Sequence, residues 1–215
     1  MSTKRQSAMP AAPPTPVHFV PDRSGGDGGD GRSSHVVMAD AVYVVGAFPV
    51  TISSNTVIHP RARLDAKGGP INIGRRCIVE ERAVVGGGGS SSHHSGPVSL
   101  PGSFPSREGS VTLGDYVSVE TGAVIEAGAA VGQGSVVGAR SQVGSGAVIG
   151  RYCTLAPQTR IPAGEKVPDY TVVFGQQRRR DGRMGASETR HQLQTLKIEV
   201  LRKLIPSVPE KYMAA

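Results

Sequence analysis

The sequence predicts an all-β solenoid, a parallel β-helix of hexapeptide repeats, followed by a C-terminal amphipathic α-helix. Aliphatic residues recur at every sixth position from Leu113 to Val173 without a break. Small residues stand two places before most of them, and glycine is the commonest residue directly after. The chain also has 29 glycines but no Trp, four Phe and five Tyr, a composition that cannot fill a broad aromatic core.

Each six-residue unit reads as one short strand and one corner. Side chains two apart on a strand share a face, so the aliphatic and the small residue both point inward, and glycine permits the bend that follows. Hexapeptide periodicity is typical of a parallel β-helix, whose coils are stable only when stacked. Including two shorter upstream registers, the expected inward positions are Ile52, Ile58, Leu64, Ile73, Val79, Val85, Leu113, Val119, Ile125, Val131, Val137, Val143, Ile149, Leu155, Ile161, Val167 and Val173.

The domain layout follows from where the repeat holds and where it breaks. We expect a disordered Pro/Gly/Ser-rich tail over 1–40, the β-helix over 41–174 with an interrupting loop at 86–110, and a basic linker with the final helix over 175–215. The helix is expected at about 189–205. Its apolar residues at helical spacing are Leu193, Leu196, Val200, Leu201 and Leu204. We expect this face to pack on a flank of the β-helix, with docking on another subunit as the alternative.

Composition excludes several classes of protein. Two cysteines, Cys77 and Cys153, give no disulfide framework, and both fall on the small inward position, which predicts buried, inert thiols. No run of about 18 apolar residues is present that could span a membrane. The chain carries a net charge of +7, but the cluster of Arg178, Arg179, Arg180 and Arg183 lacks a stacking aromatic, so we expect a solvated connector and no nucleic-acid partner.

Acyl transfer is the first catalytic alternative. Many hexapeptide-repeat proteins are acyltransferases that use a loop histidine as general base. Only His93 and His94 stand on the interrupting loop, and its Ser/Gly composition offers neither rigidity nor an orienting carboxylate. We therefore expect no catalytic residue and no cofactor, with acyl transfer kept as the alternative function.

Metal chemistry is the second alternative. The segments I-N-I-G-R-R-C-I-V-E-E-R-A-V-V-G and S-V-E-T-G-A-V-I-E-A-G-A-A-V-G resemble the γ-class carbonic anhydrases, which bind zinc with three histidines. Aligning those motifs places Gly86, Thr121 and Glu126 at the three histidine positions. Since catalytic zinc needs three protein ligands, we expect no metal site.

A more specific resemblance is carried by T-V-I-H-P-R-A-R-L at 56–64, by G-P-I-N-I-G with I-V-E-E, and by Q-T-L-K-I-E-V-L-R-K-L-I-P near the C-terminus. These segments resemble the dynactin subunit 6 family. The resemblance implies a left-handed β-helix and a non-catalytic subunit of the dynactin pointed-end complex, in the cytoplasm and on the microtubule cytoskeleton. It implies as partners the sister β-helix dynactin subunit 5, dynactin subunit 4 and the pointed-end actin-related protein, and indirectly dynein and its cargo adaptors, without direct membrane insertion.

The ends of the solenoid are the expected contact faces. Exposed coil strands offer unpaired backbone groups to another chain. Pro162, Pro168 and the final helix are expected to screen the late coils, so we expect the N-terminal end, near Val42 to Ile52, to be the open one.

Overall fold

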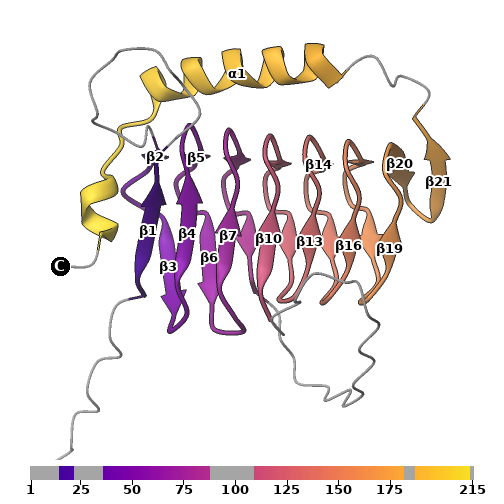
Figure 1. Ribbon diagram of the computed structural model, residues 1–215, viewed down its shortest axis with the longest axis horizontal. Coiled ribbons are helices and arrows are strands. Elements are labelled where there is room, and N and C mark those ends of the chain that lie inside the picture. The colour runs from indigo at the N-terminus through magenta and orange to yellow at the C-terminus, as the bar shows by residue number, and fades with distance from the viewer. Residues whose placement is uncertain (1–14, 22–35, 88–108, 182–186, 214–215) are drawn as a thin grey trace, which may run out of the picture.

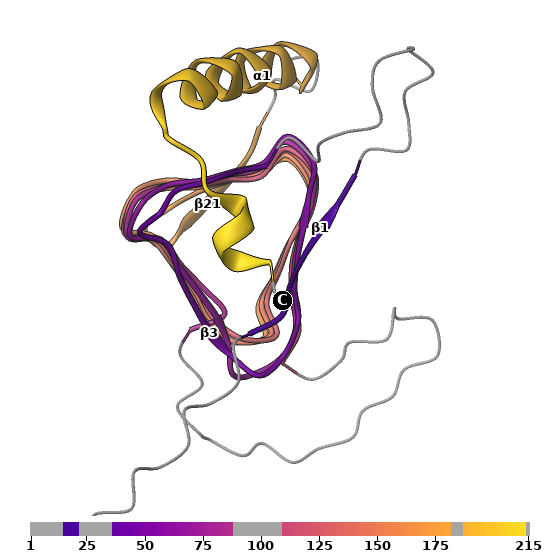
Figure 2. The ribbon, with the colours of Figure 1, turned by 90° about the vertical axis from the view of Figure 1, so that its left-hand side faces the viewer.

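The chain folds into a three-sided parallel β-helix with a long helix lying along one side (Figures 1 and 2). The computed structural model describes residues 15–21, 36–87, 109–181 and 187–213. Each of six coils contributes one strand to each of three sheets, and a further partial coil ends the stack. The expected solenoid fold is confirmed.

The strands are short and pair in parallel with the strand one coil away. Sheet 1 contains β1 (Val17–Val20), β4 (Val50–Ser53), β7 (Ile71–Ile73), β10 (Val111–Leu113), β13 (Ala130–Val131), β16 (Val148–Ile149) and β19 (Lys166–Val167). Sheet 2 contains β2 (Val37–Met38), β5 (Val57–Ile58), β8 (Ile78–Val79), β11 (Ser118–Val119), β14 (Val136–Val137), β17 (Thr154–Leu155), β20 (Thr171–Phe174) and β21 (Gln177–Arg180). Sheet 3 contains β3 (Tyr43–Gly46), β6 (Arg63–Ala66), β9 (Val84–Val85), β12 (Val124–Ile125), β15 (Gln142–Val143) and β18 (Arg160–Ile161).

The core is three columns of aliphatic side chains, one behind each sheet. Within a column each residue pairs in register with its counterpart in the next coil, as Val119 pairs with Val137 and Val137 with Leu155. The structure buries every expected inward position, the most exposed being Val167 at 3%.

The solenoid starts earlier than the sequence predicts. Strand β1 pairs with β4, so that Phe19 stands opposite Ile52, and Met38 of β2 stands opposite Ile58. The expectation of a disordered tail through residue 40 is therefore wrong for these segments. These segments form a first coil. Without it, the apolar side chains and strand edges of the second coil would be uncovered.

The chain beyond the last coil also differs from the expected basic linker. Strand β21 turns back antiparallel on β20 and carries Arg178, Arg179 and Arg180, which pair with Val173, Val172 and Thr171. The arginines form a hairpin strand because their backbone groups extend sheet 2, while their side chains remain exposed. Arg183 lies outside the described residues.

Two further elements follow. Helix α1 (Ser187–Leu204), within two residues of the expected bounds, runs back along most of the solenoid, and a short 3-10 helix, η2 (Pro209–Tyr212), lies across the N-terminal end of the solenoid (Figures 1 and 2). No helix among the described residues is long and apolar enough to span a membrane.

The inward assignment can be tested with one substitution at two strand valines. Val137 is fully buried, whereas Val148 is 40% exposed. Val137→Asp places an uncompensated charge in the core and should lower the free energy of unfolding by roughly 3 kcal/mol or more. Val148→Asp should cost less than about 1 kcal/mol. Urea unfolding measures both, and equal losses would contradict the assignment of inward and outward positions.

Candidate interaction surface

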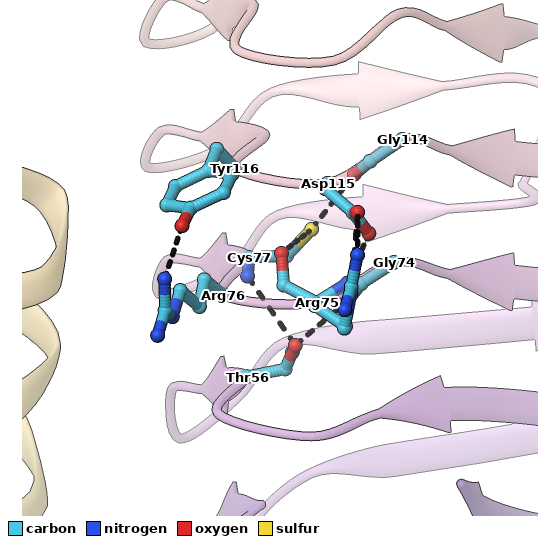
Figure 3. Close-up of polar contacts among 8 residues, drawn as sticks. All are labelled: Thr56, Gly74, Arg75, Arg76, Cys77, Gly114, Asp115 and Tyr116. Carbon is cyan, nitrogen blue, oxygen red and sulfur yellow. Dashed lines mark hydrogen bonds and ion pairs between the residues drawn. The ribbon is translucent and has the colours of Figure 1, made fainter. Parts of the chain in front are cut away.

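Small polar side chains inside the coils form hydrogen bonds with backbone groups of the next coil. Thr56 Oγ1 donates to the Gly74 carbonyl at 2.9 Å and accepts from the Cys77 N–H at 3.3 Å (Figure 3). Ser135 repeats the arrangement three coils later, donating to the Gly150 carbonyl and accepting from the Cys153 N–H. These hydroxyl groups therefore link successive coils by hydrogen bonds and are not positioned to act as catalytic groups.

The two cysteines also contact the backbone of the next coil. Cys77 Sγ lies 3.1 Å from the Gly114 carbonyl, and Cys153 Sγ lies 3.0 Å from the Pro168 carbonyl. Burial raises the pKa of the Cys77 thiol to about 12 and also raises the pKa of Cys153. Because the thiolate is the nucleophile, neither thiol is set up to react.

Charged side chains at the corners also link coils. Asp115 accepts hydrogen bonds from the backbone N–H of Arg75 at 2.8 Å and from its guanidinium, and Arg76 bonds the Tyr116 hydroxyl (Figure 3). Asp169 repeats the first contact with Arg151 three coils on.

One corner of the triangle forms a column that receives α1. Its residues, where sheet 1 turns into sheet 2, have φ between 54° and 68° in every coil from the second onward. They are Asn55, Arg76, Tyr116, Gly134, Tyr152 and Tyr170. Gly134 is the gap in this column, because a Cβ there would lie 2.5 Å from the Tyr152 ring.

His191 of α1 lies at that gap. Its ring stacks on Tyr116 with centroids 3.9 Å apart and lies 5.7 Å from Tyr152, which in turn stacks on Tyr170 at 5.3 Å. Further along the helix, Gln194 Nε2 donates to the Arg76 carbonyl at 2.7 Å and Arg202 bonds Asn55. The helix is thus positioned by side chains that match the column residue by residue.

A second apolar cluster holds the C-terminal half of the helix. Ile198 is 2% exposed and packs on Val37, Val57 and Ile78, the outward residues of β2, β5 and β8. Lys197 Nζ lies 2.8 Å from Glu80 Oε1. Burial alone would raise the pKa of Glu80, but the bond and charge of Lys197, with Thr121, outweigh it and lower that pKa.

The expectation that the apolar face of the helix packs on the solenoid is wrong for four of its five residues. Leu201 packs on the second cluster, but Leu193, Leu196, Val200 and Leu204 are 56–69% exposed. The solenoid-facing side is built instead from His191, Gln194, Ile198 and Arg202, because this side meets carbonyl groups and rings as well as apolar side chains. A sequence signal for this docking surface lies in two pairs of adjacent aliphatic residues, Val57–Ile58 and Ile78–Val79. Adjacent aliphatic residues on a strand point to opposite faces, so these pairs indicate strands buried on both faces.

The segment after α1 covers part of the N-terminal end of the solenoid, which we expected to be open. The Val208 N–H donates to the Met38 carbonyl at 2.9 Å, and the Met38 N–H donates to Ser207 Oγ at 3.0 Å. The Tyr212 hydroxyl lies 2.6 Å from the Asp40 carbonyl and accepts from the Val42 N–H at 3.2 Å. These contacts use backbone groups of the first coil at and just after β2, whereas β1 and β3 at this end, and β19 and β18 at the other end, are the outermost strands of sheets 1 and 3.

The three positions that align with zinc-binding histidines have structural roles. Glu126 Oε2 accepts the Ser145 N–H at 3.0 Å, Thr121 bonds Glu80, and Gly86 donates its N–H to the Ile125 carbonyl. Across the parts of the chain that the structure describes, no three His, Cys, Asp or Glu side chains gather as a metal site would require. His93 and His94 lie outside those parts.

These features define a hexapeptide-repeat β-helix protein whose polar groups serve the scaffold and whose distinctive surface is the docked helix. No protein-family model matches the chain. A solved hexapeptide transferase family protein from Anaplasma phagocytophilum shares the fold with a TM-score of 0.57 at 15% identity, covering 88% of this chain and 97% of that one.

Two curated relatives are more informative. Dynactin subunit 6 of Danio rerio is 29% identical over 181 residues, covering 82% of this chain and 87% of the relative. Dynactin subunit 6 of Xenopus tropicalis is 27% identical over 158 residues, covering 74% and 73%. The chain is a distant relative of dynactin subunit 6, which confirms the resemblance seen in its sequence motifs.

Histidine protonation should weaken helix docking. Burial lowers the pKa of His191, so the unfolded chain takes up its proton near pH 6.5 and the folded chain only at lower pH. Stability is therefore complete above about pH 6.5 and falls as pH decreases through that value. His191→Phe keeps a ring in the stack and should reduce the loss of melting temperature between about pH 7.5 and about pH 5. The exposed His18→Phe is the control, and an unchanged pH dependence in His191→Phe would contradict this role.

The zinc expectation has a direct test. The purified chain should hold far less than one zinc per molecule after dialysis against a weak chelator, because Gly86 offers no side-chain ligand and Thr121 and Glu126 are engaged with other coils. Elemental analysis measures it, and stoichiometric zinc would overturn the expectation.

Proposed function

We propose that the chain is a non-catalytic structural subunit of dynactin, positioned in the pointed-end complex. The observation that carries the proposal is the relationship with two dynactin subunit 6 proteins, the first extending over 82% of the chain. In this role the protein supports attachment of dynein and cargo adaptors for transport along microtubules, in the cytoplasm and on the cytoskeleton.

The scaffold chemistry supports a structural role. The buried hydroxyls and thiols bond carbonyls of neighbouring coils, and the corner carboxylates bond backbone N–H groups. A rigid stack with such corners is suited to presenting fixed surfaces to other proteins.

The proposed partners are the sister β-helix dynactin subunit 5, dynactin subunit 4 and the pointed-end actin-related protein. We assign the contact with the sister β-helix to the C-terminal end of the solenoid. Strands β18 and β19 are the outermost strands of sheets 3 and 1 there, and Arg160 and Lys166 are exposed on them. Edge strands with free backbone groups favour strand pairing with another chain.

Co-purification tests this proposal. A tagged chain should recover dynactin subunit 5 and the other pointed-end subunits from native extract. Arg160→Glu with Lys166→Glu should reduce that recovery by about ten-fold, because reversed charges at the contact are unfavourable. Arg82→Glu with Arg140→Glu, on exposed corners within the stack, is the matched control. Equal recovery with both double variants would move the contact elsewhere, and no recovery of dynactin subunits by the parent chain would overturn the function.

The alternative remains a hexapeptide-repeat acyltransferase using His93 or His94. Turnover of acetyl-coenzyme A by the purified chain, abolished by alanine at both histidines, would favour it over the structural role. The shared fold with a transferase-family structure at 15% identity does not by itself favour this chemistry.

A further inference from the structure

Helix α1 exposes a continuous apolar stripe on the side away from the solenoid. The stripe consists of Leu193, Leu196, Val200 and Leu204, which are 61%, 57%, 56% and 69% exposed. Their spacing of three, four and four residues places them on one face of the helix. The contacts that hold α1 to the solenoid come from the opposite face, so the stripe is not needed for docking the helix.

The N-terminal end of the stripe meets a groove between α1 and sheet 2. The groove has a volume of about 340 Å³, and Tyr116, Val136 and Leu193 contribute to its walls. It exists because the outward residues of sheet 2 become smaller or polar here, at Ser118 and Thr154, where the earlier coils present Val57 and Ile78. The apolar surface therefore continues from a ridge into a pocket that admits one bulky side chain.

Positive charge borders the stripe on both sides. On a helix of about 3.6 residues per turn, Lys197 and Lys203 project to either side of the stripe, while Glu188 and Glu199 project further round. The Lys197 side chain is 50% exposed although its Nζ contacts Glu80. Lys203 is exposed and makes no ion pair with any residue that the structure describes.

We propose that this stripe is a docking site for an amphipathic α-helix of a partner protein whose apolar seam is bordered by carboxylates. A helix laid along α1 covers residues spaced by three and four, as in a two-helix coiled coil, and its carboxylates face Lys197 and Lys203. An apolar residue at its end enters the groove beside Leu193. The proposal does not depend on the assignment to dynactin.

A second copy of the chain fits the stripe less well. It would bring the same two lysines to the contact. In addition, four side chains on one helix fall well short of the roughly 800 Å² per partner that a stable dimer usually buries.

Two helical probes test the proposal. One is a stapled, monomeric peptide with a leucine seam bordered by glutamates, and the other has lysines in place of the glutamates. Fluorescence anisotropy with the full chain should show about ten-fold tighter binding of the acidic peptide, with a preference that decreases as salt increases. Lys203→Glu should reduce this preference.

Matched variants locate the site. Leu196→Ser with Val200→Ser should weaken binding of the acidic peptide by about ten-fold, whereas Gln192→Ser with Glu199→Ser, exposed on another side of the same helix, should not weaken it. Circular dichroism should show unchanged melting for both pairs, because the substituted residues are exposed.

Other results would overturn the proposal. They are no binding of either peptide, equal binding of both, and binding insensitive to the serine substitutions at the stripe. Concentration-dependent dimerisation, seen by sedimentation and lost in Leu196→Ser with Val200→Ser, would assign the stripe to a second copy instead.

Discussion

The structure depends on the in-register stacking of aliphatic side chains from one coil to the next. Each inward residue, such as Val137, is covered above and below by its counterparts in neighbouring coils, and no coil can bury its own face alone. This requirement fixes the length of a regular coil and demands corners with positive φ, which even three tyrosines adopt. The cost of those backbone conformations is offset because every corner also carries inter-coil hydrogen bonds.

A stack of this kind has two open ends, and the chain treats them differently. Helix α1 runs along sheet 2 toward the first coil, and the segment after it brings Ser207 and Tyr212 to that coil, where they bond backbone groups of Met38, Asp40 and Val42. Among the residues that the structure describes, the far end receives only the β20–β21 hairpin, on one of its three sheets. The C-terminal segment thus makes the two ends of the solenoid different, although the repeats themselves are alike.

The periodic part of the fold could be predicted from sequence because one pattern of six residues encodes strand, face and corner together. The first coil could not, since the chain between Val20 and Val36 interrupts the period and the strand at Val17–Val20 lies in a proline-rich segment. The helix could also be predicted from the sequence, but the face that it turns toward the solenoid could not. Its docking face contains His191, Gln194 and Arg202, which recognise a ring column and carbonyl groups, so the more apolar side was wrongly assigned to the solenoid.

The apolar side of α1 faces away from the solenoid. Apolar side chains on a docked helix usually face the core, because burial of a leucine contributes about 1.5–3 kcal/mol. Here the register is set by His191 in the gap at Gly134 and by Ile198 on the second cluster, and together they direct Leu196 and Val200 outward. The same contacts that fasten the helix therefore hold an apolar stripe in a fixed orientation, which lowers the entropic cost for a partner that binds it.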